Sequence, residues 1–300
     1  MKDYRKIGIL GGDARMRYAA EALSGIAECA VWGIGGDFAS PLVRAADWQG
    51  AVRGADAVVL PLPVTRDGVT LSAPDAGEQI PLDAILDRMP TGALLFGGKL
   101  PPLYTECAKE RGIRAVDYYE DEAFQIAGAV QTAEGAVAAC VNSLPGTVSG
   151  MDCAVIGYGR LGRTLANRLR AFGAHVTVAA RSPRDRAWAE ADGCKATSLD
   201  GWAADPGSPD AVFSTVPVTV IGADALGHLP PSAVLFELAA GIDREAAEAC
   251  GLRVIPLPGL PGKVAPKSAG EGIAASVARI LGEGGRSPWI RCQSPASDLL

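Results

Sequence analysis

The chain has 300 residues, of which 48% are hydrophobic and 21% charged, and its formal net charge is -6. This length suits two domains better than one, so a sizeable core can form without disulfides or metals. The acidic balance argues against a nucleic-acid partner, which favours basic clusters. The amino terminus lacks the apolar stretch of a secretion signal and no apolar run is long enough to span a bilayer, so we expect a cytoplasmic protein without membrane contact.

The cysteines and histidines give no sign of a metal centre. Seven cysteines are scattered with no pair at metal-ligand spacing, which predicts buried thiols in a reducing compartment. The two histidines, His175 and His228, lie in no nucleophile motif, and we expect both to be structural.

The first half of the chain alternates short apolar segments with helical stretches. Strands are predicted at residues 7–10, 30–32, 57–60, 93–96 and 114–116. This alternation predicts a parallel sheet covered by helices. Gly11-Gly12-Asp13 is not expected to be a nucleotide loop, because no third glycine follows at the right spacing, and Asp13 is predicted to cap a helix.

Three cations follow strands of this half. Arg15 comes after the first predicted strand, Arg66 after the third and Lys99 after the fourth. Parallel strands end at one edge of a sheet, where ligands usually bind, so the three side chains could converge on one crevice. The alternative is three independent surface charges.

One long helix is predicted at residues 121–144, ending at Pro145-Gly146, of the kind that connects the halves of two-domain dehydrogenases. Thr132 and Glu134 would lie midway along it, near an interdomain cleft. The alternative is that both belong to an ordinary helix surface.

The most specific motif follows a hydrophobic run that ends at residue 156. Its sequence is Gly157-Tyr158-Gly159-Arg160-Leu161-Gly162. A helix at 160–172 and a second strand at 175–180 are predicted to follow. In such a strand, loop and helix, the first glycine allows a tight turn, the second a close approach to a pyrophosphate and the third close helix packing. The segment therefore predicts a Rossmann dinucleotide-binding unit.

The residues after the second strand bear on the choice of cofactor. Units that prefer NAD usually place an acid here for the ribose 2′-hydroxyl, whereas this chain has Arg181-Ser182. A guanidinium and a hydroxyl suit a 2′-phosphate, which predicts NADP rather than NAD. The alternative is that Arg181 is a solvated loop residue and Ser182 only caps the helix beginning at Pro183.

Further strands are predicted at residues 211–215, 233–238 and 253–255. Thr215, Val216 and Pro217 would line the nicotinamide side of the site. Residues 257–270, rich in proline and glycine, are predicted to form a rigid loop carrying Lys263 and Lys267. A helix at 268–281 should then pack back onto the first domain, ahead of a loosely ordered tail.

The predicted fold is an α/β protein with two doubly wound parallel sheets joined by a long helix. We expect a flavodoxin-like substrate domain at residues 1–125 together with a helix at about 268–283, and a linker helix at 126–150. A Rossmann domain at 151–267 and a flexible tail at 284–300 complete the chain.

In combination, these motifs resemble the A subunit of bacterial dipicolinate synthase over nearly the whole chain. The segments that carry the resemblance are residues 11–15, 61–63, 96–99, 132–136, the glycine loop at 157 and residues 260–267. The resemblance implies an NADP-linked oxidation of dihydrodipicolinate, a cyclic dicarboxylate made on the lysine pathway, to dipicolinate during endospore formation. It also implies that the flavoprotein-like B subunit of dipicolinate synthase is the partner, in the mother cell. Residues 237–241 depart from the aspartate and serine expected in relatives, which leaves the role of that loop open.

A substrate with two carboxylates needs cationic or backbone donors at both ends. The candidate substrate-binding residues are Arg15, Arg66, Lys99 and Lys263. Glu134 is the candidate proton acceptor, Thr132 would orient the substrate, and Lys267 is a further cation with a candidate catalytic role.

Two other functions stay open. A 2-hydroxy-acid dehydrogenase is disfavoured because Ala240 stands where such enzymes carry an arginine, and because His228 has no matching acid signature. A non-catalytic NADP-binding scaffold for the partner is compatible with the scarcity of acid–base residues. Whether the chain forms a homo-oligomer is also left open.

Overall fold

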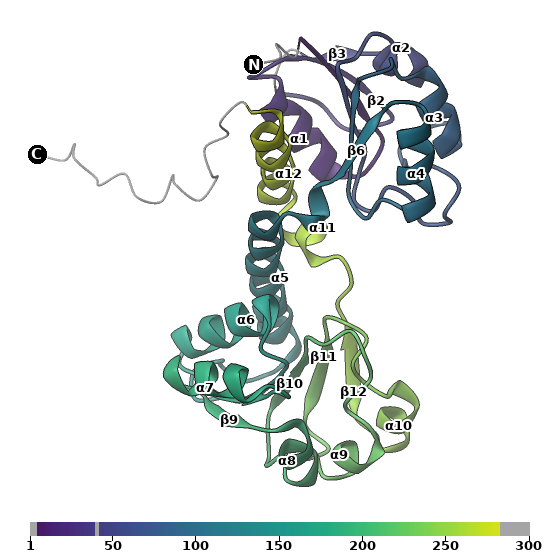
Figure 1. The fold of residues 1–300 in the computed structure, drawn as a ribbon. Helices are drawn as coiled ribbons and strands as arrows, with labels where there is room; N and C mark the ends of the chain where they lie inside the picture. The colour runs from purple at the N-terminus through teal and green to yellow at the C-terminus, as the bar shows by residue number, and fades with distance from the viewer. Residues whose placement is uncertain (1–4, 40–41, 283–300) are drawn as a thin grey trace, which may run out of the picture. The chain divides into compact units, whose positions relative to one another are not determined.

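The computed structural model describes residues 5–39 and 42–282. The chain divides into two compact units, one formed by residues up to 127 together with those from 265 onward, the other by residues 128–264. Each unit contains a six-stranded parallel sheet with helices on both faces (Figure 1). The predicted fold class is therefore confirmed, whereas the predicted tail at 284–300 lies outside the described residues.

The first unit has the sheet order β3-β2-β1-β4-β5-β6. Its strands are β1 (Lys6–Leu10), β2 (Glu28–Trp32), β3 (Val43–Arg44), β4 (Ala57–Val59), β5 (Leu94–Gly97) and β6 (Arg114–Asp117). The five longer strands follow the flavodoxin-like order, and the two-residue strand β3 extends the sheet at one edge. Sequence analysis missed β3, because two exposed residues at a sheet edge carry no hydrophobic pattern.

Helices from both ends of the chain cover this sheet. Helix α1 (Ala14–Leu23) and helix α12 (Pro266–Leu281) lie together on one face, side by side in Figure 1. Helices α2 (Trp48–Val52), α3 (Leu82–Arg88) and α4 (Pro102–Glu110) cover the other face. Gly270 of α12 lies against the carbonyl oxygen of Arg15, where a larger side chain would overlap it. Helix α12 thus packs onto α1 and the core of the first unit.

The second unit has the sheet order β12-β11-β10-β7-β8-β9, which is the Rossmann order. Its strands are β7 (Asp152–Ile156), β8 (His175–Ala179), β9 (Lys195–Thr197), β10 (Ala211–Ser214), β11 (Val234–Glu237) and β12 (Arg253–Pro256). Its helices are α6 (Arg160–Ala171), α7 (Pro183–Ala191), α8 (Leu199–Ala204), α9 (Ala223–Gly227), α10 (Arg244–Ala249) and α11 (Leu260–Val264). Sequence analysis missed the short edge strand β9.

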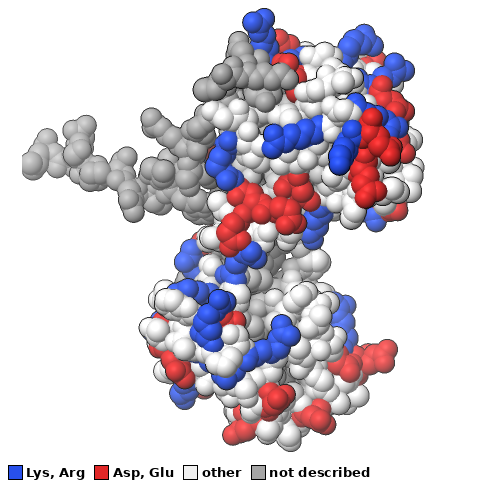
Figure 2. Space-filling view, viewed as in Figure 1, with Lys and Arg blue, Asp and Glu red and all other residues white. Residues whose placement is uncertain are grey.

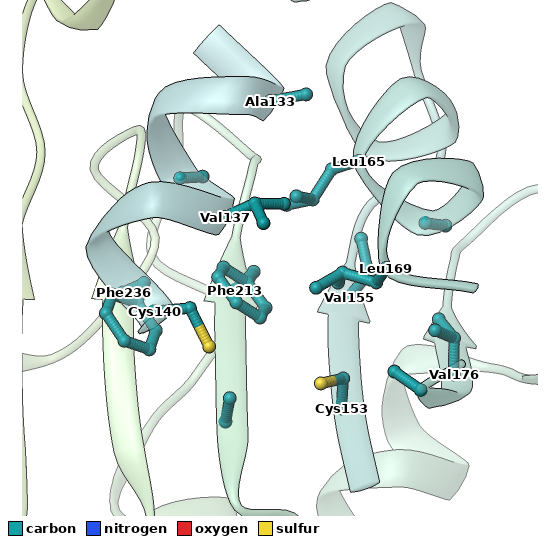
Figure 3. Close-up of a cluster of buried hydrophobic side chains, with 14 of the residues drawn as sticks. Ala133, Val137, Cys140, Cys153, Val155, Leu165, Leu169, Val176, Phe213 and Phe236 are labelled. Carbon is teal, nitrogen blue, oxygen red and sulfur yellow. The ribbon is translucent and has the colours of Figure 1, made fainter. Parts of the chain in front are cut away.

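The long helix α5 (Glu122–Ser143) agrees with the helix predicted at 121–144, whereas the linker helix predicted at 126–150 extends past its end at Ser143. In sequence, α5 crosses the boundary between the two units. Its later turns are part of the core of the second unit: Ala133, Val137 and Cys140 face the sheet beside side chains of α6 (Figure 3). Beneath them the rings of Phe213 and Phe236 stack with centroids 4.9 Å apart. Helix α5 is thus held in the second unit by a buried apolar face.

The prediction of a rigid loop at residues 257–270 is wrong in part. Residues Leu260–Val264 form helix α11, and α12 begins at Pro266 rather than at residue 268. Pro261 and Pro266 both lie in first turns, where a proline costs nothing because the N–H it lacks would have no intrahelical acceptor. Lys263 therefore lies on α11 and Lys267 in the first turn of α12.

Basic and acidic side chains are interspersed over the face shown in Figure 2. Within the described part of the chain, no helix is long and apolar enough to cross a membrane. The six described cysteines are free thiols, and four of them are buried as predicted. The prediction of burial is wrong for Cys107, which is half-buried, and for Cys250, which is exposed in the residue that ends α10.

Candidate functional site

The glycine loop of the second unit follows β7. Gly157 has a φ of 100°, a left-handed conformation that favours glycine, and its N–H donates to the carbonyl of Ala179 at 2.8 Å. Gly162 lies directly on the carbonyl oxygen of Gly157. Gly159 has no atom within 4 Å of where a side chain would begin, so the space beside it is open. The tight turn, the close helix packing and the open approach are all present in this loop.

The amino end of α6 suits an anion. Helix α6 begins at Arg160, directly after Gly159, and its first turn contains no acidic residue. The first N–H groups of a helix have no intrahelical acceptor and carry the positive end of the helix dipole. Leu161, half-buried, packs against the core, whereas Arg160 is exposed. The loop and helix therefore fit a dinucleotide pyrophosphate, the group for which sequence analysis selected them.

Thr215, Val216 and Pro217 follow β10 beside this loop. The hydroxyl and the N–H of Thr215 both donate to the carbonyl of Ile156, at 2.9 and 3.0 Å. A side chain at position 157 would meet Thr215 and Val216. Thr215 and Val216 are half-buried, whereas Pro217 is exposed. Thr215 and Val216 thus lie directly beside Gly157 of the glycine loop.

The turn after β8 contains Arg181 and Ser182. The hydroxyl of Ser182 accepts from the N–H of Asp185 and caps α7. Arg181 is exposed, and its side chain makes no hydrogen bond or ion pair with any described residue. Nη1 of Arg186 donates to the carbonyls of Ala180 and Arg181 at 2.9 and 2.8 Å. Ser182 thus has the capping role of the alternative interpretation, while Arg181 is available to an anion.

In the first unit, Asp13 organises the edge of the sheet. Its carboxylate caps α1 by accepting the N–H of Arg15 at 3.0 Å, and it accepts Nε and Nη2 of the same residue at 2.8 Å each. Nη2 of Arg15 also donates to the carbonyl of Leu62 at 2.5 Å. Burial raises the pKa of Asp13, but the hydrogen bonds and charge of Arg15 and the charge of Arg66 outweigh it, so the pKa lies below its ordinary 3.8. The structure therefore brings Arg15 and Arg66 toward one carboxylate.

Lys99 lies in a loop bonded to the Pro61 segment. Gly98 donates to the carbonyl of Pro61 at 3.1 Å, and Val64 donates to that of Gly98 at 3.0 Å. Lys99 has a φ of 57°, and its N–H donates to the carboxylate of Asp117 at 3.1 Å. Its ammonium lies 5.0 Å from the ring centroid of Tyr119. Lys99 thus shares the sheet edge with Arg15, with its charge resting over an aromatic ring.

The candidate catalytic residues are dispersed. The hydroxyl of Thr132 donates to the carbonyl of Gly128 at 2.7 Å, one turn earlier on α5. Glu134 is exposed and forms a 3.4 Å ion pair with Arg168 of α6. Lys263 and Lys267 lie on different helices. Among the described residues, no hydrogen bond or ion pair joins these candidate side chains to one another.

Sequence analysis missed three carboxylates that organise loops. Asp117 holds the Lys99 loop, and Asp192 binds the hydroxyl of Tyr158 at 2.8 Å. Glu237, at the end of β11, is 7% exposed and paired with Arg244, whose Nε lies 2.8 Å away. Asp117 and Glu237 come directly after apolar runs, and this position could have marked them as residues that organise loops. No local pattern links Asp192 to the glycine loop.

Two family models match the chain in succession. Residues 6–119 match the N-terminal domain of the dipicolinate synthase A subunit. Residues 126–246 match the NAD-binding domain of D-isomer specific 2-hydroxyacid dehydrogenases. The second match supports a nicotinamide dinucleotide cofactor and an oxidoreductase.

Individual relatives found by sequence and by structure are also dipicolinate synthase A subunits. The dipicolinate synthase A subunit of Bacillus subtilis (strain 168) is 29% identical over 232 residues, which cover 76% of this chain and 78% of that protein. The crystal structure of the dipicolinate synthase A chain from Bacillus subtilis superposes with a TM-score of 0.83 at 27% identity, covering 94% of this chain and 97% of that one. The crystal structure of the A subunit from Bacillus halodurans superposes with a TM-score of 0.81 at 28% identity, covering 92% of this chain and 97% of that one.

The chain therefore matches in succession the N-terminal domain of the dipicolinate synthase A subunit and a dehydrogenase NAD-binding domain, and it is similar to that A subunit over nearly its whole length.

Proposed function

We propose that this chain acts as the A subunit of dipicolinate synthase and oxidises dihydrodipicolinate to dipicolinate with NADP. The observation that carries the proposal is the full-length likeness to two solved A-subunit structures. The reaction balances as dihydrodipicolinate and NADP⁺ giving dipicolinate, NADPH and a proton. One ring carbon loses a hydride, a proton is lost as well, and the aromaticity of the pyridine product supplies driving force.

The second unit would hold the cofactor. Backbone N–H groups of residues 157–162 would bind the pyrophosphate, and residues 215–217 would line the nicotinamide side. When bound, the nicotinamide supplies the hydride acceptor. Arg181, which has no partner among the described residues, would bind the 2′-phosphate, which supports NADP over NAD.

The first unit would bind the substrate. Arg15 offers a guanidinium whose orientation is fixed by Asp13, and its Nη1, which donates to no described residue, would donate to a substrate carboxylate. Arg66 and Lys99 would assist at the same sheet edge. Tyr119, beneath the ammonium of Lys99, adds an aromatic face for a planar ring.

Four further residues would act on the substrate. Lys263 would bind the second carboxylate, and Lys267 would contribute a further cation. Glu134 would accept the proton and Thr132 would orient the substrate. Catalysis would rest chiefly on placing the ring against the cofactor, so a strong general base is not required.

The activity would belong to endospore formation in the mother cell, with the flavoprotein-like B subunit of the synthase as partner. A non-catalytic NADP-binding scaffold is the second candidate, favoured by the dispersed positions of Thr132 and Glu134. Oxidation of a 2-hydroxy acid is disfavoured because Ala240 offers no cation.

The test is an anaerobic assay of the purified chain with dihydrodipicolinate generated in place, with NADP or NAD, and with or without the B subunit. Dipicolinate absorbance and reduced-cofactor fluorescence are followed together. Both products forming without the partner, faster with NADP, would support the proposal. Products that appear only with the partner would favour the scaffold, and no product under either condition would contradict the assigned activity.

A further inference from the structure

Tyr158 lies between two glycines that face the cofactor site, but its side chain turns into the protein. It is 6% exposed, and its hydroxyl donates to Oδ2 of Asp192 at 2.8 Å. Asp192 is the C-terminal cap of α7. The middle of the glycine loop is therefore fastened to the far end of a different helix.

Arg163 of α6 binds the same carboxylate. Its Nε lies 2.8 Å from Oδ2 of Asp192 and its Nη2 lies 3.3 Å from Oδ1. The guanidinium rests over the ring of Trp188 on α7, 4.6 Å from the centroid. Arg170 of α6 donates to the backbone carbonyl of Asp192 as well. The end of α7 is thus held by α6 and by the glycine loop together.

The protonation states of Asp192 and Tyr158 suit the hydrogen bond between them. The hydrogen bond from Arg163 and then that from Tyr158 lower the pKa of Asp192, despite an opposing effect of burial, so the carboxylate is the ionised acceptor at neutral pH. Burial, followed by the hydrogen bond to Asp192, raises the pKa of Tyr158, so its hydroxyl keeps the proton that it donates. Hydrogen bonds to a charged group are stronger than neutral ones.

The other end of α7 carries the turn after β8. Ser182 caps that end, and Arg186, one turn into the helix, binds the carbonyls of Ala180 and Arg181. One short helix therefore contacts both segments that a Rossmann unit uses for the ADP half of its cofactor. Its amino end holds the ribose turn, and its carboxyl end holds the glycine loop.

We infer that Asp192 and Arg163 are positioning residues for the dinucleotide site, acting through Tyr158 to fix the glycine loop in its binding conformation. The inference rests on dinucleotide binding by the second unit, which is part of the proposed function. A loop already held in its binding geometry loses less conformational freedom when the pyrophosphate arrives, which favours affinity without any direct contact. None of the three side chains needs to touch the cofactor.

The test compares Tyr158→Phe and Asp192→Asn with Tyr104→Phe. Tyr104 is a matched control because it is equally buried and donates one hydrogen bond, to the carbonyl of Leu82 at 3.2 Å between α3 and α4. The Kd values for NADP and NAD are measured by calorimetry without substrate, well below the melting temperature. The Tm of each variant is measured by thermal unfolding. Tyr158→Phe should raise both Kd values by about 3- to 10-fold, corresponding to roughly one hydrogen bond. Tyr104→Phe should lower Tm without changing Kd.

The double variant Tyr158→Phe/Asp192→Asn should bind no more weakly than Asp192→Asn alone, because the two residues act as one unit. Unchanged Kd values in Tyr158→Phe with a lowered Tm would overturn the inference and leave a purely structural role. Altered Kd values in a chain that forms no dipicolinate would contradict the proposed substrate but uphold the inference. A wild-type chain that binds neither dinucleotide would overturn both.

Discussion

Gly162 lies directly against the carbonyl oxygen of Gly157, so a Cβ atom at position 162 would overlap that oxygen. The carbonyl belongs to Gly157, which has a left-handed φ of 100° and whose N–H donates to the carbonyl of Ala179 at 2.8 Å. Gly162→Ala should therefore lower the free energy of unfolding by about 1–3 kcal/mol or more and weaken dinucleotide binding. Chemical denaturation and calorimetric titration measure the two effects.

Gly159→Ala should behave differently, because nothing lies within 4 Å of its Cβ and its φ of -77° suits any residue. Stability should stay within about 0.5 kcal/mol of wild type, whereas dinucleotide Kd should rise at least ~10-fold as the methyl group meets the pyrophosphate. Gly128→Ala is the matched control, a glycine with equally open surroundings on α5. If Gly159→Ala binds dinucleotide like wild type, the loop does not hold the pyrophosphate.

Arg181→Ala tests the choice of cofactor. Loss of a guanidinium that binds a 2′-phosphate should raise the Kd for NADP about 10- to 100-fold and leave that for NAD unchanged. Arg184→Ala is a suitable control, since that side chain is 82% exposed three residues further on. Equal effects on NADP and NAD would show that Arg181 does not contact the 2′-phosphate.

Arg15→Ala tests the substrate site. Removing the guanidinium that Asp13 orients should raise KM for dihydrodipicolinate by at least ~10-fold. Arg15→Lys should restore little, because an ammonium cannot form the paired hydrogen bonds to Asp13 that orient the guanidinium. Arg111→Ala offers a matched control, since Arg111 makes a 2.8 Å ion pair with Asp87 between α3 and α4. Steady-state kinetics at saturating NADP decide the outcome, and an unchanged KM in Arg15→Ala would remove Arg15 from the site.

The carboxylate of Asp13 should give the first unit a pH-dependent stability. Its pKa is lowered in the folded state from the ordinary 3.8, so its contribution to stability is present above that ordinary value and is lost as the pH falls through the lower folded value. Asp13→Asn keeps a good helix cap but removes the charge. Denaturation at several pH values should show Asp13→Asn less stable than wild type at neutral pH, with a difference that shrinks in acid. A difference independent of pH would contradict this.

Much of the fold could be predicted because local patterns agree with it. The apolar runs that became β1, β7 and β10 are buried central strands, and α5 has a sustained apolar face and a clear stop. The elements missed, β3 and β9, are short edge strands in which few side chains are buried. The helix at Leu260–Val264 was missed because proline and glycine were taken as signs of a loop, although the first turn of a helix accepts proline.

The candidate site was predictable where function depends on backbone. Glycines at 157, 159 and 162 have positions in sequence that dictate their positions in space. Side-chain partners across the fold were not accessible in this way: nothing near Tyr158 in sequence indicates Asp192, and nothing near Lys99 indicates Tyr119. Such pairs arise from packing between elements that only the folded chain brings together.

The measurement that tests the proposed function most directly follows the hydrogen itself. Dihydrodipicolinate deuterated at its saturated ring carbons is incubated anaerobically with the purified chain and NADP, and the reduced cofactor is analysed by mass spectrometry. We predict one deuterium in NADPH for each dipicolinate formed. Dipicolinate that forms without NADPH, or NADPH that carries no deuterium, would contradict a hydride transfer from this substrate to the cofactor.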